Sequence, residues 1–175
     1  MRTITRTAIA LSGAAALTLL AVVPANAADT VTVAIAEGAL GLVTTEGGAA
    51  LTEAVPGAAI EGQVAGVQVT DARAITGAWA VSVNATAFTN TAAPDDAASM
   101  TAAAITYTMG AVTATGAPVI TNITPDVVLT AVDAQVATAT VAGNNSALWT
   151  ADLSIAVPAG ALAGTYSTTI THSVL

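Results

Sequence analysis

The chain has 175 residues, of which 54% are hydrophobic and only 8% are charged, and it carries three Lys or Arg residues against eleven acids. So few basic residues exclude the clustered positive charge that nucleic-acid binding requires, and they argue against binding to an acidic lipid surface. The absence of Cys excludes disulfides, thiolate chemistry and Cys-based zinc sites.

The N-terminal segment has the pattern of an export signal. Arg2 and Arg6 precede an apolar stretch, Ala8 to Val23, that is short for a membrane span. The small residues of Ala25-Asn26-Ala27 then match the site that a signal peptidase recognises. We predict a signal peptide that is cleaved after Ala27, with an uncleaved anchor as the alternative.

The remainder, residues 28–175, is predicted to form a single domain after the signal peptide at 1–27 is removed, because its length suits one hydrophobic core. It keeps all eleven acids, and Arg73 is its only Lys or Arg. No stretch of it is long and apolar enough to span a bilayer. We therefore expect a secreted domain without membrane contact after cleavage.

Alternation of apolar and polar residues predicts β-strands along this domain. The first two strands carry Val or Ile at every second position: Val31, Val33 and Ile35 in one, then Val67 and Val69 in the other. The next strand directs its larger apolar side chains to one face, at Trp79, Val81, Val83 and Ala85. Ala97 to Ala104 also suits a helical turn, so its structure stays open.

The C-terminal part contains the clearest alternation. One strand places Trp149, Ala151, Leu153, Ile155 and Val157 on a single face, and the last strand does the same with Tyr166, Thr168, Ile170, His172 and Val174. Turn signals such as Pro56-Gly57 separate the strands. Many short strands with regular turns predict an all-β fold, an antiparallel β-sandwich of the Ig-like or Greek-key type.

The residue inventory argues against catalysis. Residues 28–175 contain one His, one Arg, no Lys and no Cys, so most general bases and nucleophile activators are missing. His172 lies between Ile170 and Val174 on one strand face, which favours a packed and hydrogen-bonded side chain. Asp95-Asp96 is interpreted as a solvated loop or helix cap rather than a Ca²⁺ site. We predict no enzyme, no catalytic residue, no metal site and no cofactor.

Two further sets of residues have alternative interpretations. Asp71 and Arg73 are two positions apart, so they share a strand face and can pair, either as a structural ion pair or as a ligand contact. Trp79, Trp149 and Tyr166 all lie on apolar strand faces. Core packing is therefore favoured over an external stacking platform for sugars.

Two regions of the chain resemble those of the WxL-domain surface proteins of Gram-positive bacteria. The first consists of Val67 to Arg73, followed by Gly77 to Val83 and Phe88, and the second runs from Leu148-Trp149 to Val157-Pro158 and on through Ala163 to Thr171. Ala103 to Tyr107 is similar to the middle strand of the family. The chain departs from the pattern at Val81, where the first W-x-L motif has Leu, and at His172-Ser173-Val174, where a Trp-centred triplet is expected.

The resemblance implies an all-β domain that attaches non-covalently to the cell wall, with peptidoglycan as the ligand. Asp71, Arg73, Trp79 and His172 are the candidate binding residues. No lipobox Cys or sorting motif offers a covalent anchor. The alternative is a structural or adhesive surface subunit that contacts other surface proteins or copies of itself through edge strands.

Overall fold

The computed structural model describes residues 32–45, 49, 51, 53–90, 100–101, 104–122 and 126–175. The predicted signal peptide, the Asp95-Asp96 pair and most of the stretch from Ala97 to Ala104 lie outside these residues. All of the strands belong to the unit formed by Ile35–Leu175.

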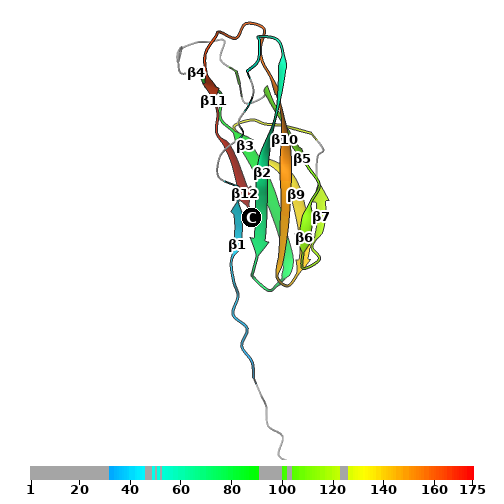
Figure 1. Cartoon of the computed structure of the whole chain (residues 1–175). Coiled ribbons are helices and arrows are strands. Elements are labelled where there is room, and N and C mark those ends of the chain that lie inside the picture. Colours follow the sequence, from blue (N-terminus) through cyan, green and yellow to red (C-terminus); the bar gives the residue numbers. More distant parts are fainter. Residues whose placement is uncertain are drawn as a thin grey trace, which may run out of the picture. The chain divides into compact units, whose positions relative to one another are not determined.

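The described residues form antiparallel β-sheets without an α-helix, which confirms the predicted all-β class (Figure 1). One sheet has the order β1 (Leu40–Val43), β2 (Ala59–Asp71), β10 (Asn145–Ala156), β5 (Ile105–Met109) and β8 (Val127–Val128), with β6 (Thr113–Thr115) also paired to β10. The second has the order β12 (Ile170–Val174), β3 (Thr76–Ala85), β9 (Ala134–Ala142) and β7 (Val119–Asn122). A separate two-stranded ribbon pairs β4 (Thr89–Asn90) with β11 (Tyr166–Ser167).

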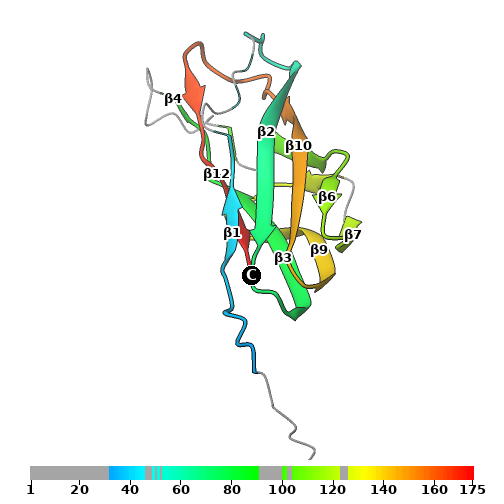
Figure 2. The same ribbon diagram turned by 60° about the horizontal axis from the view of Figure 1, so that its bottom comes forward.

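Both main sheets contribute to one buried apolar cluster. The predicted inward faces are confirmed: Trp79 and Val81 on β3, and Trp149 and Leu153 on β10, are each at most 2% exposed. Burying a large apolar side chain stabilises a fold by roughly 2 kcal/mol, so these alternating faces supply much of the driving force. The edge strands β1 and β12 lie side by side, as Figure 1 and Figure 2 both show.

A bulge in β2 changes which residues face the core. Val67 pairs with Trp149 and Val64 pairs with Ala151, so two residues of β2 lie opposite one residue of β10. Gly66 occupies the bulge with a φ of 64°, a left-handed conformation that glycine adopts without steric cost. The bulge therefore directs both Val64 and Val67 inward, although three positions separate them.

The strand predicted at Val31, Val33 and Ile35 is wrong for the described part of that segment. Residues 32–39 form no strand, and the side chains of Val33 and Ile35 are 77% and 82% exposed. The first backbone hydrogen bond of this segment is made at Gly38, whose N–H donates to the Ala72 carbonyl oxygen, and β1 itself begins at Leu40. Alternation alone does not make a strand, because the backbone also needs a neighbouring chain to bond.

The single strand predicted from Tyr166 to Val174 is divided into β11 and β12. Its two halves pair with different strands, because Tyr166 lies opposite Asn90 and Ile170 lies opposite Ala85. Thr86 bonds to the residues between β11 and β12. The Thr168 hydroxyl donates to the Thr86 carbonyl oxygen at 2.7 Å, and the Thr169 backbone N–H donates to Thr86 Oγ1 at 3.1 Å. Ribbon and sheet therefore separate at this point.

Candidate functional site

An ion pair stands where β2 ends. The Arg73 guanidinium donates from Nε to Asp71 Oδ1 and from Nη2 to Oδ2, both at 2.9 Å, and the Arg73 backbone N–H donates to Oδ1 at 3.1 Å. Nη2 also donates to the Ala78 carbonyl at 3.1 Å, which ties the pair to β3. The predicted pairing is confirmed, although Arg73 lies just beyond the strand.

Asn145 extends this pair into the core. It lies directly opposite Asp71 in the ladder between β2 and β10. Its Nδ2 donates to Asp71 Oδ2 at 3.3 Å and to the Gly143 carbonyl at 3.1 Å, while its Oδ1 accepts from Trp79 Nε1 at 3.1 Å. We call the chain Arg73, Asp71, Asn145 and Trp79 the Asp71 network.

The Asp71 network presents one charged side chain to solvent. Asp71 and Trp79 are each 1% exposed, whereas 20% of the Arg73 side chain is exposed. Hydrogen bonding from Arg73 lowers the pKa of Asp71 to about 2, against the opposing effect of burial, and the bond to Asp71 raises the pKa of Arg73. Both groups are therefore charged at any ordinary pH, and only the guanidinium can meet a ligand.

A second network surrounds the Tyr107 hydroxyl. Trp149 Nε1 donates to Tyr107 Oη at 3.1 Å, and His172 Nε2 lies 3.1 Å from the same oxygen. The Tyr107 and His172 rings are tilted against each other with centroids 5.5 Å apart. The prediction that His172 is packed and hydrogen-bonded is confirmed. We call Trp149, Tyr107 and His172 the Tyr107 network.

The protonation of this network follows from its burial. Burial lowers the pKa of His172 to about 4 and raises the pKa of Tyr107 to about 12, the latter against the effect of the Trp149 bond. Both groups are thus neutral near pH 7. Because the Tyr107 oxygen accepts from Trp149, its own proton is available to His172 Nε2, and the imidazole then carries its proton on Nδ1.

The structure divides the four candidate residues between the two networks. Asp71, Arg73 and Trp79 share one, while His172 belongs to the other. Trp79 and Val83, the residue opposite His172, are four positions apart on β3, a separation of about 13 Å along a strand.

Sequence reasoning missed Asn145 and Tyr107, the residues at the centre of each network. Asn145 belongs to none of the candidate sites predicted from the sequence, and Tyr107 is predicted only as part of the middle strand. Nothing in the local pattern shows that Asn145 lies opposite Asp71, since the two are 74 positions apart.

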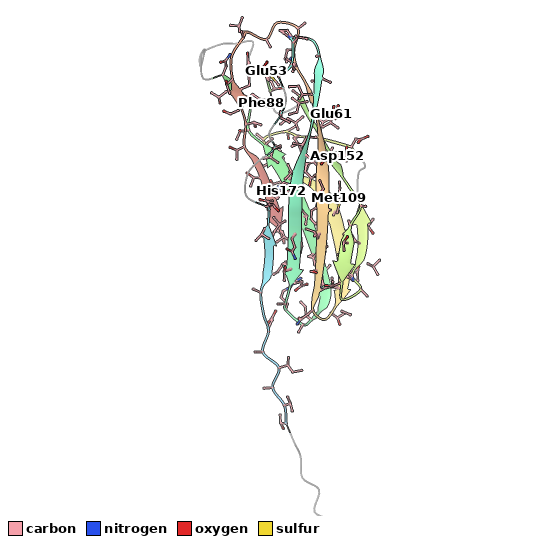
Figure 3. All side chains as sticks on the ribbon, in the orientation of Figure 1. Glu53, Glu61, Phe88, Met109, Asp152 and His172 are labelled. Atoms are coloured by element: carbon pink, nitrogen blue, oxygen red, sulfur yellow. The ribbon has the colours of Figure 1, made fainter. Side chains whose placement is uncertain are left out.

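A cleft of about 510 Å³ opens beside the N-terminal half of β2. Its lining includes Leu51, Val64, Phe88, Tyr166 and His172. Figure 3 places Phe88 toward the ribbon of β4 and β11, with His172 further along on β12. We call this space the β2 cleft.

The described residues contain no group of three or more His, Asp or Glu side chains that could hold a metal ion. No helix in the described part of the chain is long and apolar enough to cross a membrane.

Comparison with known proteins identifies one family. A family model described as WxL domain surface cell wall-binding matches residues 49–174. No curated protein matches the chain. Among solved structures the chain is similar to a family 123 glycoside hydrolase from Clostridium perfringens, reported for glycolipid glycan hydrolysis, with 14% identity and a TM-score of 0.37. That match covers 69% of this chain and only 19% of the enzyme, and a likeness this weak carries no functional argument.

Proposed function

The chain belongs to the family of WxL-domain surface proteins that bind the cell wall, and from this premise we propose that it is a secreted, non-catalytic protein of the Gram-positive cell surface, with peptidoglycan as its ligand. The match over residues 49–174 carries the proposal, because it includes every strand from β2 to β12. The proposal includes a signal peptide at 1–27 and a single domain at 28–175. We interpret the two facing sheets as a β-sandwich of the Ig-like or Greek-key type.

We assign the direct wall contact at the Asp71 network to Arg73. The stem peptides of peptidoglycan carry carboxylates, and a guanidinium N–H forms charge-assisted hydrogen bonds with a carboxylate. Asp71 uses Nε and Nη2, which leaves Nη1 without a hydrogen bond to any described residue. Asp71 and Trp79 are buried, so their role is to position Arg73 rather than to touch the wall.

His172 is assigned a different part in binding. It occupies the place of the second Trp-centred triplet, keeps an aromatic ring there, and bonds to Tyr107. Its ring also lines the β2 cleft. We propose that it holds β12 against the core and forms part of the wall of that cleft.

The same geometry supports a non-catalytic role. The one His is hydrogen-bonded, and burial lowers its pKa to about 4, so it is a poor general base. Asp71 is committed to the ion pair. The hydroxyl beside His172 belongs to Tyr107, which is fully buried, and burial raises its pKa to about 12, so it is a poor nucleophile.

The test is co-sedimentation of residues 28–175 with purified Gram-positive peptidoglycan, comparing walls with and without their attached polymers. We expect saturable pelleting with both preparations. Arg73→Ala is expected to weaken binding about tenfold, the effect of losing roughly 1.4 kcal/mol of ion pairing. Val132→Ala is the matched control, because Val132 is 73% exposed and belongs to neither network. Protein that stays in the supernatant with both walls would refute the proposal.

Self-association or contact with other surface proteins is the second candidate. It is favoured by β7 and β8, the end strands of the two sheets, which carry Val119 at 68% and Val128 at 54% exposure. Unpaired strand edges with exposed apolar side chains can add a strand from another chain. Sedimentation velocity across a hundredfold concentration range separates the two functions, because only this candidate predicts a rising mass.

A further inference from the structure

We propose that the β2 cleft binds an uncharged segment of N-acetylated amino sugars, so that the domain holds the glycan strand of the wall as well as its peptide. This inference rests on the proposed function and assigns it a second site. It is carried by the shape of the cleft, the chemistry of its lining and its distance from Arg73.

The β2 cleft lies between two parts of the domain that diverge, namely the N-terminal half of β2 with its partner β10, and the break between β11 and β12. On one side, β2 and β10 continue past the bulge at Gly66 and present Val64, Leu153 and Ile155. On the other side, the break between β11 and β12 places Tyr166 in the ribbon and His172 in the sheet. The inward face of the first half of β2 is therefore only partly covered.

The floor of the cleft depends on Gly62. Gly62 lies opposite Leu153, and a Cβ built on it would collide with the side chain of Leu51. The missing side chain allows Leu51 to lie over the sheet. The result is an apolar floor between the two sides of the cleft.

The described residues that line the cleft carry no formal charge. Although the chain has a formal charge of −8, no Asp, Glu, Lys or Arg is among the described residues that line the cleft. A carboxylate or phosphate of the wall would find no cation there. Arg73 is remote, because the β10 partners of Asp71 and Val64 are six positions apart, about 20 Å at the rise of an extended strand.

The remaining groups suit an N-acetylated sugar. Apolar side chains and the rings of Phe88, Tyr166 and His172 offer surfaces for the acetyl methyl group and for the C–H face of a pyranose ring. Hydroxyl groups at Thr44, Thr45 and Ser167 offer hydrogen bonds to ring hydroxyls and to the acetamido group. A volume of about 510 Å³ lies within the ordinary range for small-molecule sites.

The experiment uses the exported protein and isothermal titration calorimetry with N-acetylglucosamine tetrasaccharide. Cellotetraose is the matched probe, because it keeps the hydroxyls and lacks the acetamido groups. We expect the acetylated oligomer to bind at least about tenfold more tightly than cellotetraose, equivalent to about 1.4 kcal/mol. A soluble stem peptide without sugar, which the proposed function assigns to Arg73, is expected to leave the affinity for the tetrasaccharide unchanged.

Two variants test the location. Leu51→Glu places a charge on the apolar floor and is expected to weaken tetrasaccharide binding about tenfold or more. Val132→Glu introduces the same charge at an exposed position away from the cleft and should leave binding within about twofold. Tyr166→Ala is the second cleft variant, and thermal melting verifies that each variant is folded.

The outcomes separate this inference from the proposed function. Equal binding by both tetrasaccharides, no binding at millimolar concentration, or binding unchanged in folded Leu51→Glu and Tyr166→Ala would overturn the sugar site. If whole walls still bind and only Arg73→Ala reduces that binding, the proposed function stands without the cleft. If the tetrasaccharide binds but walls do not, the proposed function fails instead.

Discussion

Replacing Asp71 with Asn removes the charge at the centre of the Asp71 network while keeping the shape of the side chain. The pKa of Asp71 is lowered from 3.8 to about 2 in the folded protein. At about 1.4 kcal/mol per pKa unit, the carboxylate would stabilise the fold by about 2.4 kcal/mol without screening. Because solvent reaches Arg73, we expect about 1 to 2 kcal/mol.

The sign of the pH dependence follows from the direction of the shift. The folded pKa is the lower one, so between about pH 2 and 4 the unfolded chain binds more protons than the folded chain. The contribution of Asp71 is therefore complete above about pH 4 and is lost as the pH falls toward 2. At pH 2.5 about one third of it should remain.

The assay is urea unfolding of the wild type and Asp71→Asn, followed by the fluorescence of the two buried Trp residues. We expect a difference in unfolding free energy of about 1 to 2 kcal/mol at pH 7 that shrinks to about one third at pH 2.5. Protonation of His172 affects both proteins equally and cancels in the difference. A difference that is absent at pH 7, or that does not change with pH, would refute this account of the ion pair.

Three further predictions concern the rest of the domain. Because burial lowers the pKa of His172 from 6.5 to about 4, the unfolded chain binds more protons between these values, and the wild type should lose about 3 kcal/mol of stability from pH 6.5 to 4. A folded His172→Phe variant should show a flatter profile in the same urea titration, and an unchanged slope would contradict the assignment. Tyr107→Phe removes the partner of Trp149 and His172 and should cost about 1 to 3 kcal/mol in urea unfolding, whereas a cost near zero would show that the network does not stabilise the core. Deleting residues 28–36 from the mature chain should leave the melting temperature within about 1 °C, because Val33 and Ile35 are exposed and unpaired, and a clear fall would mean that this segment packs on the domain.

The sites show how far local patterns reach. The pairing of Asp71 with Arg73 was predictable, because residues two apart near a strand end are close in any conformation. The burial of Trp79 and Trp149 was predictable from a different local pattern, because each begins an alternating apolar face. The His172 environment followed from its apolar neighbours, but its bond to Tyr107 did not.

The sequence by itself determined the all-β class, the inward faces of β3 and β10 and the resemblance to the wall-binding family, because alternation and short motifs are local properties of the chain. Only the tertiary structure decided which alternating segments pair with another strand. The segment at Val33 pairs with none within the described residues, while the segment from Tyr166 to Val174 pairs with two. The structure also decided that Asn145 completes the Asp71 network and that Val64, beside the bulge at Gly66, lines the β2 cleft. These features depend on ladder register between residues far apart in the chain, which no local pattern encodes.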